Sequence, residues 1–162
     1  MFEQEIRWSS GALLVLGVGF LLVISLVVGP VLLSPLRGRA LGIMLGATAT
    51  LVVVSVVIGF NFITLRVSVD ERALTVGFGP FRDHILLERI VACEPTSYRW
   101  TRWGGFGIRF RTGAKLYNVP GDGGTAAQVT LDDGRRILFS SRDPDAVCRT
   151  LRERRSEIRG EV

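Results

Sequence analysis

The sequence has few of the residues that enzymes and metal proteins most often use. It contains one histidine, His84, and two cysteines, Cys93 and Cys148. A structural zinc site needs about four ligands, and small disulfide-stabilised domains use several cysteine pairs. This set therefore predicts no metal centre and no disulfide scaffold. Two isolated cysteines, one in a β-rich and one in a helical context, are expected to be small core residues.

Motifs of catalytic or phosphate-binding sites are also missing. His84 has no accompanying Gly-x-Ser-x-Gly turn, which a nucleophilic serine would need. The glycine-rich residues 104–107 lack the lysine and the strand–loop–helix context of a phosphate-binding loop. Residues 121–124 lack the ligand spacing of a calcium loop. We therefore predict no enzyme activity, no cofactor and no small-molecule substrate.

Charged residues are absent from two long stretches, residues 8–36 and 40–65, which are separated by Arg37 and Arg39. A helix needs about 20 apolar residues to cross roughly 30 Å of hydrocarbon, so either stretch is long enough. The first is too long for a signal-peptide core and ends without a small-residue cleavage site. We predict a short N-terminal segment, residues 1–10, followed by a two-helix transmembrane hairpin over residues 11–64.

The predicted spans contain no ionisable residue, which argues against a transporter or a proton pump. The second span carries Gly42, Gly46 and Thr50, small residues that allow a neighbouring helix to approach closely. This candidate packing face has two interpretations. It can join the two helices of the hairpin, or it can bind a second copy of the chain or another membrane protein.

The arginines near the spans predict the orientation of the hairpin. Four lie on the side of the two termini and two lie in the linker: Arg7, Arg66, Arg72 and Arg82, against Arg37 and Arg39. Positive residues favour the cytoplasmic side, so this distribution predicts cytoplasmic termini by a narrow margin. The two arginines in the short linker argue the other way when they are counted per residue.

After residue 64 the hydrophobic pattern changes to the alternation of half-buried strands. Residues 65–69 and 74–78 predict a hairpin, and 132–134, Asp-Asp-Gly, predict the turn of another. Phe106, Ile108 and Phe110 alternate with polar residues and predict an amphipathic strand whose apolar face points inward.

The chain ends in a predicted amphipathic helix. Asp143 is a suitable N-cap, Pro144 a suitable first helical residue, and Val147, Leu151 and Ile158 fall on or near one face. Residues 65–162 are thus expected to form an α+β soluble domain of seven or eight strands, with a C-terminal helix from about residue 143.

Two stretches carry a resemblance to a known family. "RVSVDERALTVGFGPFRDHILLERIVACEPT" and "WGGFGIRFRTGAKLYNVPGDGGTAAQVTLDDGRRILFSSRDPDAVCRTL" are similar to the opening and closing halves of bacterial pleckstrin-homology-like (PH-like) membrane proteins. The resemblance implies an antiparallel β-roll capped by a helix, behind two membrane spans, in a binding or assembly module of the bacterial inner membrane. It does not carry over phosphoinositide binding, because the first loop here, residues 70–72, is short and net acidic.

One stretch stands out as a candidate interaction surface. It combines aromatic and basic side chains within six residues: Tyr98, Arg99, Trp100, Arg102 and Trp103. Tryptophan and arginine together are typical of a binding hot spot or of a contact with the membrane interface. The alternative is that the tryptophans cap the end of the β-roll and the arginines are merely solvated.

Charge and composition complete the functional prediction. Residues 66–162 hold 17 Arg and Lys against 13 Asp and Glu, a net charge of +4 that is scattered along the chain. This fits a domain near anionic lipids better than a nucleic-acid binder. We predict a non-enzymatic, membrane-tethered binding or scaffolding module that acts on a membrane protein partner or on itself, with its soluble domain in the cytoplasm. The alternatives are direct binding of anionic lipid headgroups by the basic β-domain, and an accessory subunit of a transporter or enzyme complex.

Overall fold

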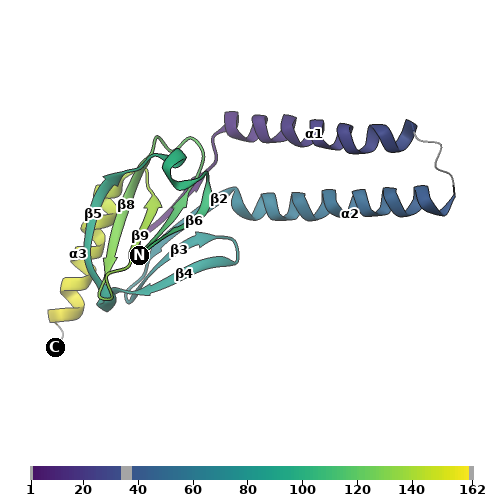
Figure 1. Ribbon diagram of the computed structural model, residues 1–162. Coiled ribbons are helices and arrows are strands. Elements are labelled where there is room, and N and C mark those ends of the chain that lie inside the picture. Colours follow the sequence, from purple (N-terminus) through teal and green to yellow (C-terminus); the bar gives the residue numbers. More distant parts are fainter. Residues whose placement is uncertain (1, 34–37, 161–162) are drawn as a thin grey trace. The chain divides into compact units, whose positions relative to one another are not determined.

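The computed structural model describes residues 2–33 and 38–160, which form two units (Figure 1). One unit, residues 10–61, consists of two helices. The other, which we call the β domain, combines residues 2–9 with the chain from residue 62 onward. The N-terminal segment and the C-terminal part of the chain therefore fold together, although the two helices separate them in sequence.

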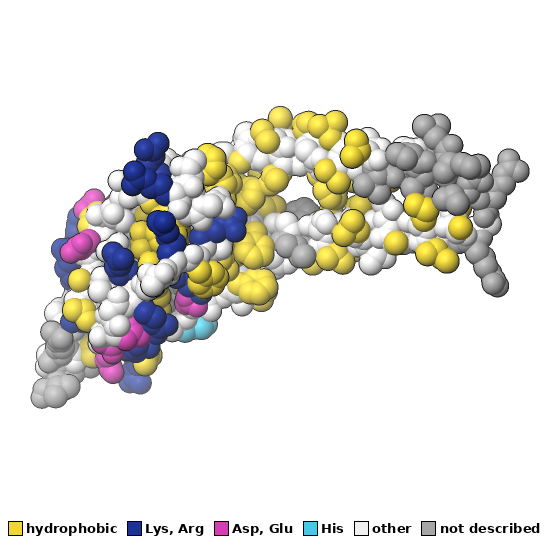
Figure 2. Space-filling model, viewed as in Figure 1, with side chains coloured by type: hydrophobic (Ala, Val, Ile, Leu, Met, Phe, Trp, Pro, Cys, Tyr) yellow, Lys and Arg dark blue, Asp and Glu magenta, His cyan; other side chains and the backbone are white. Residues whose placement is uncertain are grey.

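The helical unit consists of α1 (Ser10–Leu33) and α2 (Arg39–Phe62). Of the described residues, one helix is long and apolar enough to cross a membrane, α2 over Ala40–Val57, and α1 supplies a shorter apolar stretch, Ser10–Leu26. On the face shown in Figure 2, the described side chains of both helices are hydrophobic or uncharged. The predicted turn of the linker, residues 34–37, lies outside the described residues.

The first sheet of the β domain is antiparallel and has the order β1-β2-β3-β4. Its strands are β1 (Phe2–Arg7), β2 (Thr64–Val69), β3 (Ala73–Phe78) and β4 (Phe81–Leu86). The predicted β2–β3 hairpin is confirmed, with Leu65 opposite Phe78. Strand β1 comes from the N-terminal segment, residues 1–10, for which the sequence predicted no helix or strand. It places the buried side chain of Ile6 opposite Leu65.

The second sheet has the order β5-β8-β9-β7-β6. Its strands are β5 (Ile90–Ser97), β6 (Gly107–Arg111), β7 (Ala114–Asn118), β8 (Thr125–Leu131) and β9 (Arg136–Ser140). The predicted β8–β9 hairpin is confirmed, and Gly134 has the positive φ, 79°, that its turn requires. Strands β7 and β9 pair in parallel, whereas the other neighbours are antiparallel. From residue 64 onward the described chain forms eight strands, within the predicted seven or eight, and β1 adds a ninth strand from the N-terminal segment.

The main core of the β domain lies between the sheets and α3 (Pro144–Gly160), so the domain is α+β as predicted. Helix α3 begins as the sequence indicates, because Asp143 Oδ1 accepts a hydrogen bond from the Ala146 amide at 2.9 Å. The helix contacts β5 and β8 and buries Val147 and Leu151. Two short 3₁₀ helices, η1 (Leu87–Arg89) and η2 (Trp100–Trp103), flank β5.

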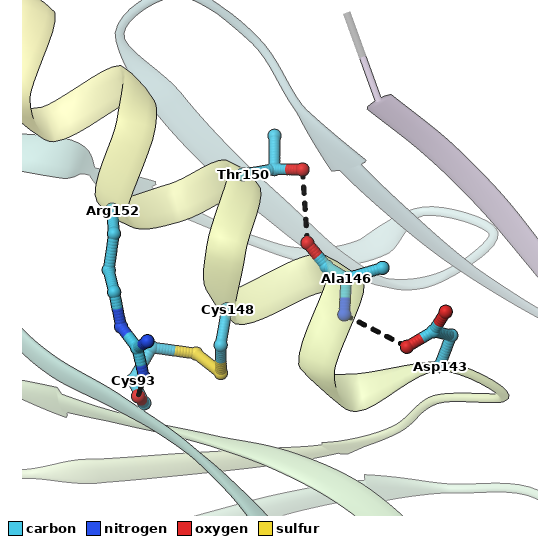
Figure 3. Close-up of a disulfide and its surroundings, with 6 residues drawn as sticks. All are labelled: Cys93, Asp143, Ala146, Cys148, Thr150 and Arg152. Carbon is cyan, nitrogen blue, oxygen red and sulfur yellow. Dashed lines mark hydrogen bonds between the residues drawn. A yellow bond between two sulfur atoms is a disulfide. The ribbon is translucent and has the colours of Figure 1, made fainter.

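The expectation of two separate core cysteines is wrong. Cys93 on β5 and Cys148 on α3 are joined by a disulfide whose Cα atoms lie 5.3 Å apart, and their side chains are 6% and 1% exposed (Figure 3). Both residues are buried as expected. Their pairing depends on the packing of α3 against β5, which the spacing of the two cysteines in sequence does not reveal.

The inward face predicted for β6 is also partly wrong. Ile108 is half-buried, but the Phe110 side chain is 73% exposed. The reason is that β6 is the edge strand of the second sheet and leaves the core toward its end. The Phe110 ring lies beside the Lys115 ammonium group, 5.2 Å from the ring centroid, which is within the range of a cation–π contact.

Candidate functional site

The strand register gives the β domain two distinct ends. The helices α1 and α2 join the domain at Ser9 and Phe62, respectively. Near these residues, the Trp8 amide donates to the Ile63 carbonyl at 3.2 Å, and the Ser9 amide donates to the Pro120 carbonyl at 3.3 Å. We call this the attachment end. It includes the loops before β6 and after β7.

The opposite end, which we call the far end, holds four chain reversals. These are the β2–β3 turn, η1, the β6–β7 turn and the β8–β9 turn. Backbone hydrogen bonds link them, including Leu87 N to Arg72 O and Asp132 N to Arg89 O, each at 2.9 Å. Strands of five or six residues at about 3.3 Å per residue separate the two ends by roughly 15–20 Å.

A groove of about 530 Å³ opens between β4, an edge strand of the first sheet, and the ends of β7 and β9 in the second. One acidic residue, Asp83, lines it. Six basic residues line it: Arg82, Arg89, Arg111, Lys115, Arg135 and Arg136. We call it the basic groove. Most of it lies toward the far end, because its lining includes Ala114 and Arg136. These are the paired first residues of β7 and β9, which both begin at that end.

Three of the basic side chains are neutralised by neighbouring carboxylates. Lys115 Nζ lies 2.8 Å from Asp83 Oδ2 and thereby joins the two sheets across the groove. Arg89 contacts Asp132 at 2.9 Å and Asp133 at 2.7 Å, and Arg135 also contacts Asp133. The hydrogen bond from Arg89 lowers the pKa of the Asp132 carboxyl below its ordinary value.

The other three, Arg82, Arg111 and Arg136, pair with no carboxylate among the described residues. Arg82 Nε donates to the Gly79 carbonyl, and the Arg111 guanidinium lies 5.6 Å from the centroid of the Trp103 ring. A guanidinium group presents a fork of N–H donors that fits carboxylates and phosphates. The groove can therefore bind an anionic ligand.

The described lining of the groove includes few side chains that could act as a nucleophile or as a metal ligand. His84 is its one histidine, and the Nδ1 atom of His84 is hydrogen-bonded to Thr75 Oγ1 at 2.9 Å. Hydroxyl and thiol side chains are absent from its described lining. In the part of the chain that the structure describes, no three His, Cys, Asp or Glu residues are grouped as metal ligands would be.

The candidate interaction surface divides into an inner and an outer part. Tyr98 is buried, and Trp103 is half-buried against a small cluster that includes Leu116 and Leu138. Trp100 is 50% exposed and stacks on Phe106, with the ring centroids 5.0 Å apart. The flanking arginines of the surface, Arg99 and Arg102, are exposed.

This surface belongs to the attachment end of the domain. The Tyr98 amide donates to the Gly124 carbonyl at 2.8 Å, at the end of the loop whose Pro120 carbonyl accepts from Ser9. Trp103 thus packs on second-sheet residues that alternate along the strands with those of the main core, whereas Trp100, Arg99 and Arg102 present an aromatic and basic surface next to the helix connections.

A partly buried polar network, which the sequence did not predict, lies beside this surface. The Tyr98 hydroxyl and Ser140 Oγ both donate to Asp122 Oδ2, and Asp122 Oδ1 accepts from the Gly124 amide at 2.8 Å. Burial, and next the hydrogen bond to Asp122, raise the pKa of Tyr98 well above its ordinary value. Asp122 therefore holds the loop 121–124 in place. Its partners come from distant parts of the sequence, so no local motif marks it.

The candidate packing face on α2 is open in the structure. A Cβ added at Gly42 or Gly46 would meet nothing within 4 Å outside its own helix. Thr50 Oγ1 donates to the Gly46 carbonyl of the same helix at 2.9 Å. The role of these three residues in helix packing stays a prediction.

Comparison of the chain with protein families, with curated proteins and with solved structures found no match.

Proposed function

We propose that the chain is a non-enzymatic binding or scaffolding module, tethered to a bacterial cell membrane by α1 and α2, whose basic groove binds an acidic segment of a membrane protein. A second copy of the chain is the other candidate partner. The β domain is in this view a PH-like roll that carries the groove, and the helices are its anchor.

The proposed hairpin is supported by the way in which the chain enters and leaves the β domain. Strands β1 and β2 pair side by side, so that α1 begins and α2 ends at adjacent points of one sheet. Two consecutive helices that cross a bilayer in opposite directions begin and end on the same side of it, which this arrangement allows. The apolar stretches of both helices, Ser10–Leu26 and Ala40–Val57, are consistent with such an anchor.

The basic groove is the observation that carries the proposal. Its lining includes six basic residues against one acidic residue, and three of these arginines form no ion pair with a carboxylate among the described residues. Strand β4 borders it as a sheet edge, so an extended peptide could add main-chain hydrogen bonds there while its acidic side chains meet the arginines. The groove extends along the strands to the far end of the β domain, roughly 15 Å from the residues at which the helices are connected.

Direct binding of anionic lipid headgroups is the second candidate function. It is supported by the outer part of the candidate interaction surface, since Trp100, Arg99 and Arg102 lie at the attachment end. An accessory role in a transporter or enzyme complex is compatible with either surface.

Peptide binding to the full chain in nanodiscs of neutral lipid tests the proposal. A fluorescent oligo-glutamate peptide should bind, and binding should fall steeply between low and high salt because surface charges are screened. The double variant Arg111→Gln with Arg136→Gln should bind at least several-fold more weakly. Arg142→Gln with Arg149→Gln, which removes two exposed arginines outside the groove, is the matched control and should bind normally.

Three results would contradict the proposal. These are no binding of the peptide, equal weakening in both double variants, or binding that requires anionic lipid in the nanodisc. The last result would favour the headgroup function.

A further inference from the structure

The Cys93–Cys148 disulfide fastens the C-terminal helix to the second sheet. It joins β5 to α3, and both cysteines are buried. Two arginines of the same helix reinforce this contact: Arg152 Nη2 donates to the Cys93 carbonyl at 3.1 Å, and Arg155 Nη1 donates to the Val91 carbonyl at 2.6 Å (Figure 3 draws Arg152). The bond belongs to the interior of the folded domain.

A bond of this kind restricts where the domain can fold. The two thiols lose two protons and two electrons to an oxidant of the disulfide class, whose own disulfide becomes two thiols. Such oxidants act outside the cytoplasm, whereas cytoplasmic glutathione and thioredoxin keep structural thiols reduced. The chain has two cysteines, and both are in this bond.

We propose that the β domain lies on the oxidising, extracytoplasmic side of the membrane and that the linker between α1 and α2 lies in the cytoplasm. This inference rests on the proposed hairpin. It reverses the orientation that the arginine count along the sequence favours.

The fold also changes how the arginines should be counted. Arg72 lies in the β2–β3 turn at the far end, and Arg66 is ion-paired with Glu5 at 2.8 Å. The positive-inside rule applies to short loops and to residues near the spans, because long domains are translocated largely regardless of their charge. Beside the spans this leaves Arg7 and Arg66 on the side of the β domain against Arg37 and Arg39 in the linker. The equal count no longer opposes the orientation that the disulfide indicates.

The orientation also specifies the partner proposed for the basic groove. An acidic segment that reaches the groove must then be displayed on the extracytoplasmic side of the same membrane.

The first test measures the redox state of the unaltered chain in cells. Cells are quenched in acid, and the denatured protein reacts with a maleimide polymer that adds visible mass to each free thiol. We expect no mass addition without prior reduction and two additions after it. Two additions without reduction would overturn the inference.

The second test locates Gly38 and Gly160 by single cysteine substitutions, Gly38→Cys in the linker and Gly160→Cys at the end of α3. The native cysteines are kept, because a disulfide does not react with maleimide, and the unsubstituted chain is the control. In intact cells an impermeant maleimide should label Gly160→Cys at least about ten-fold more than Gly38→Cys.

The reverse labelling pattern would overturn the orientation while it supports the hairpin. Labelling of both positions in intact cells, or of both only after permeabilisation, would place them on one side and overturn the hairpin itself. The redox test separates the two failures, because it does not depend on either substitution.

Discussion

Trp100 and Trp103 differ in their environment although only two residues separate them. Trp103 packs against the small cluster under η2, whereas half of the Trp100 surface is exposed. We predict that Trp103→Ala lowers the free energy of unfolding by about 2–4 kcal/mol, somewhat less than the loss of a fully buried tryptophan would. Trp100→Ala should lower it by less than about 1 kcal/mol. Thermal unfolding of the full chain in detergent measures both. A larger loss for Trp100→Ala would contradict the division of this surface.

The Tyr98 hydroxyl predicts how the stability of the β domain depends on alkaline pH. Burial raises the pKa of Tyr98, and also that of Tyr117, above the ordinary value of about 10. Their stabilising contribution is therefore complete below about pH 10 and is lost as the pH rises further, because the unfolded chain releases these protons first. The free energy of unfolding should fall above pH 10 by up to about 1.4 kcal/mol per pH unit for each tyrosine.

Tyr98→Phe provides the control for this pH dependence. It should lower stability at neutral pH, since Asp122 and Ser140 lose a partner, but it should make the fall above pH 10 about half as steep. An unchanged slope would show that Tyr98 does not cause the pH dependence.

Single residues with local partners could be read from the sequence. The Asp143 cap and the turn at Gly134 each depend on residues within four positions, and both predictions are confirmed. The exposure of Phe110 could not be predicted, because alternation does not tell an edge strand from a central one. The partners of Asp122 could not be predicted either, because strands distant in sequence bring them together.

At the scale of elements, β1 makes residues 2–7 an integral part of the β domain. Ile6 is 2% exposed and packs in the main core. We predict that Ile6→Ala lowers the free energy of unfolding by about 2–4 kcal/mol, which lowers the Tm of a domain of this size by roughly 10–25 °C. Glu3→Ala, at an exposed position of the same strand, is the control and should have little effect. Equal Tm values for the two variants would show that β1 is not part of the cooperative unit.

Elements with neighbouring partners were predictable and those with distant partners were not. The β2–β3 and β8–β9 hairpins and α3 follow from alternation, turn residues and capping. Strand β1 was missed because its partner, β2, follows only after both helices. The parallel pairing of β7 with β9 was missed because a β-meander of neighbouring strands is antiparallel, and β8 lies between them in sequence. The pairing of Cys93 with Cys148 depends on the same kind of long-range packing.

At the scale of the whole molecule, the open glycine face of α2 is predicted to pack against another helix. Replacing Gly42 and Gly46 by Ile should hold neighbouring helices apart and reduce the size of any oligomer in mild detergent. Light scattering or chemical crosslinking measures this change, with Thr48→Ile, on the opposite face of α2, as the control. An unchanged oligomer and unchanged thermal stability would show that the glycines do not mediate packing.

The central claim is that a membrane-tethered β domain binds a protein partner at its basic groove. Site-specific photocrosslinking of the full chain in its native membrane tests it most directly, with a photoreactive amino acid in place of Leu86 or Phe110. Both side chains line the groove and are exposed, whereas Arg149, exposed on α3, provides the control position. We predict a discrete protein adduct from both groove positions, lost when Arg111 and Arg136 are replaced by Gln, and none from position 149. Lipid adducts alone, or the same protein adduct from all three positions, would contradict the claim.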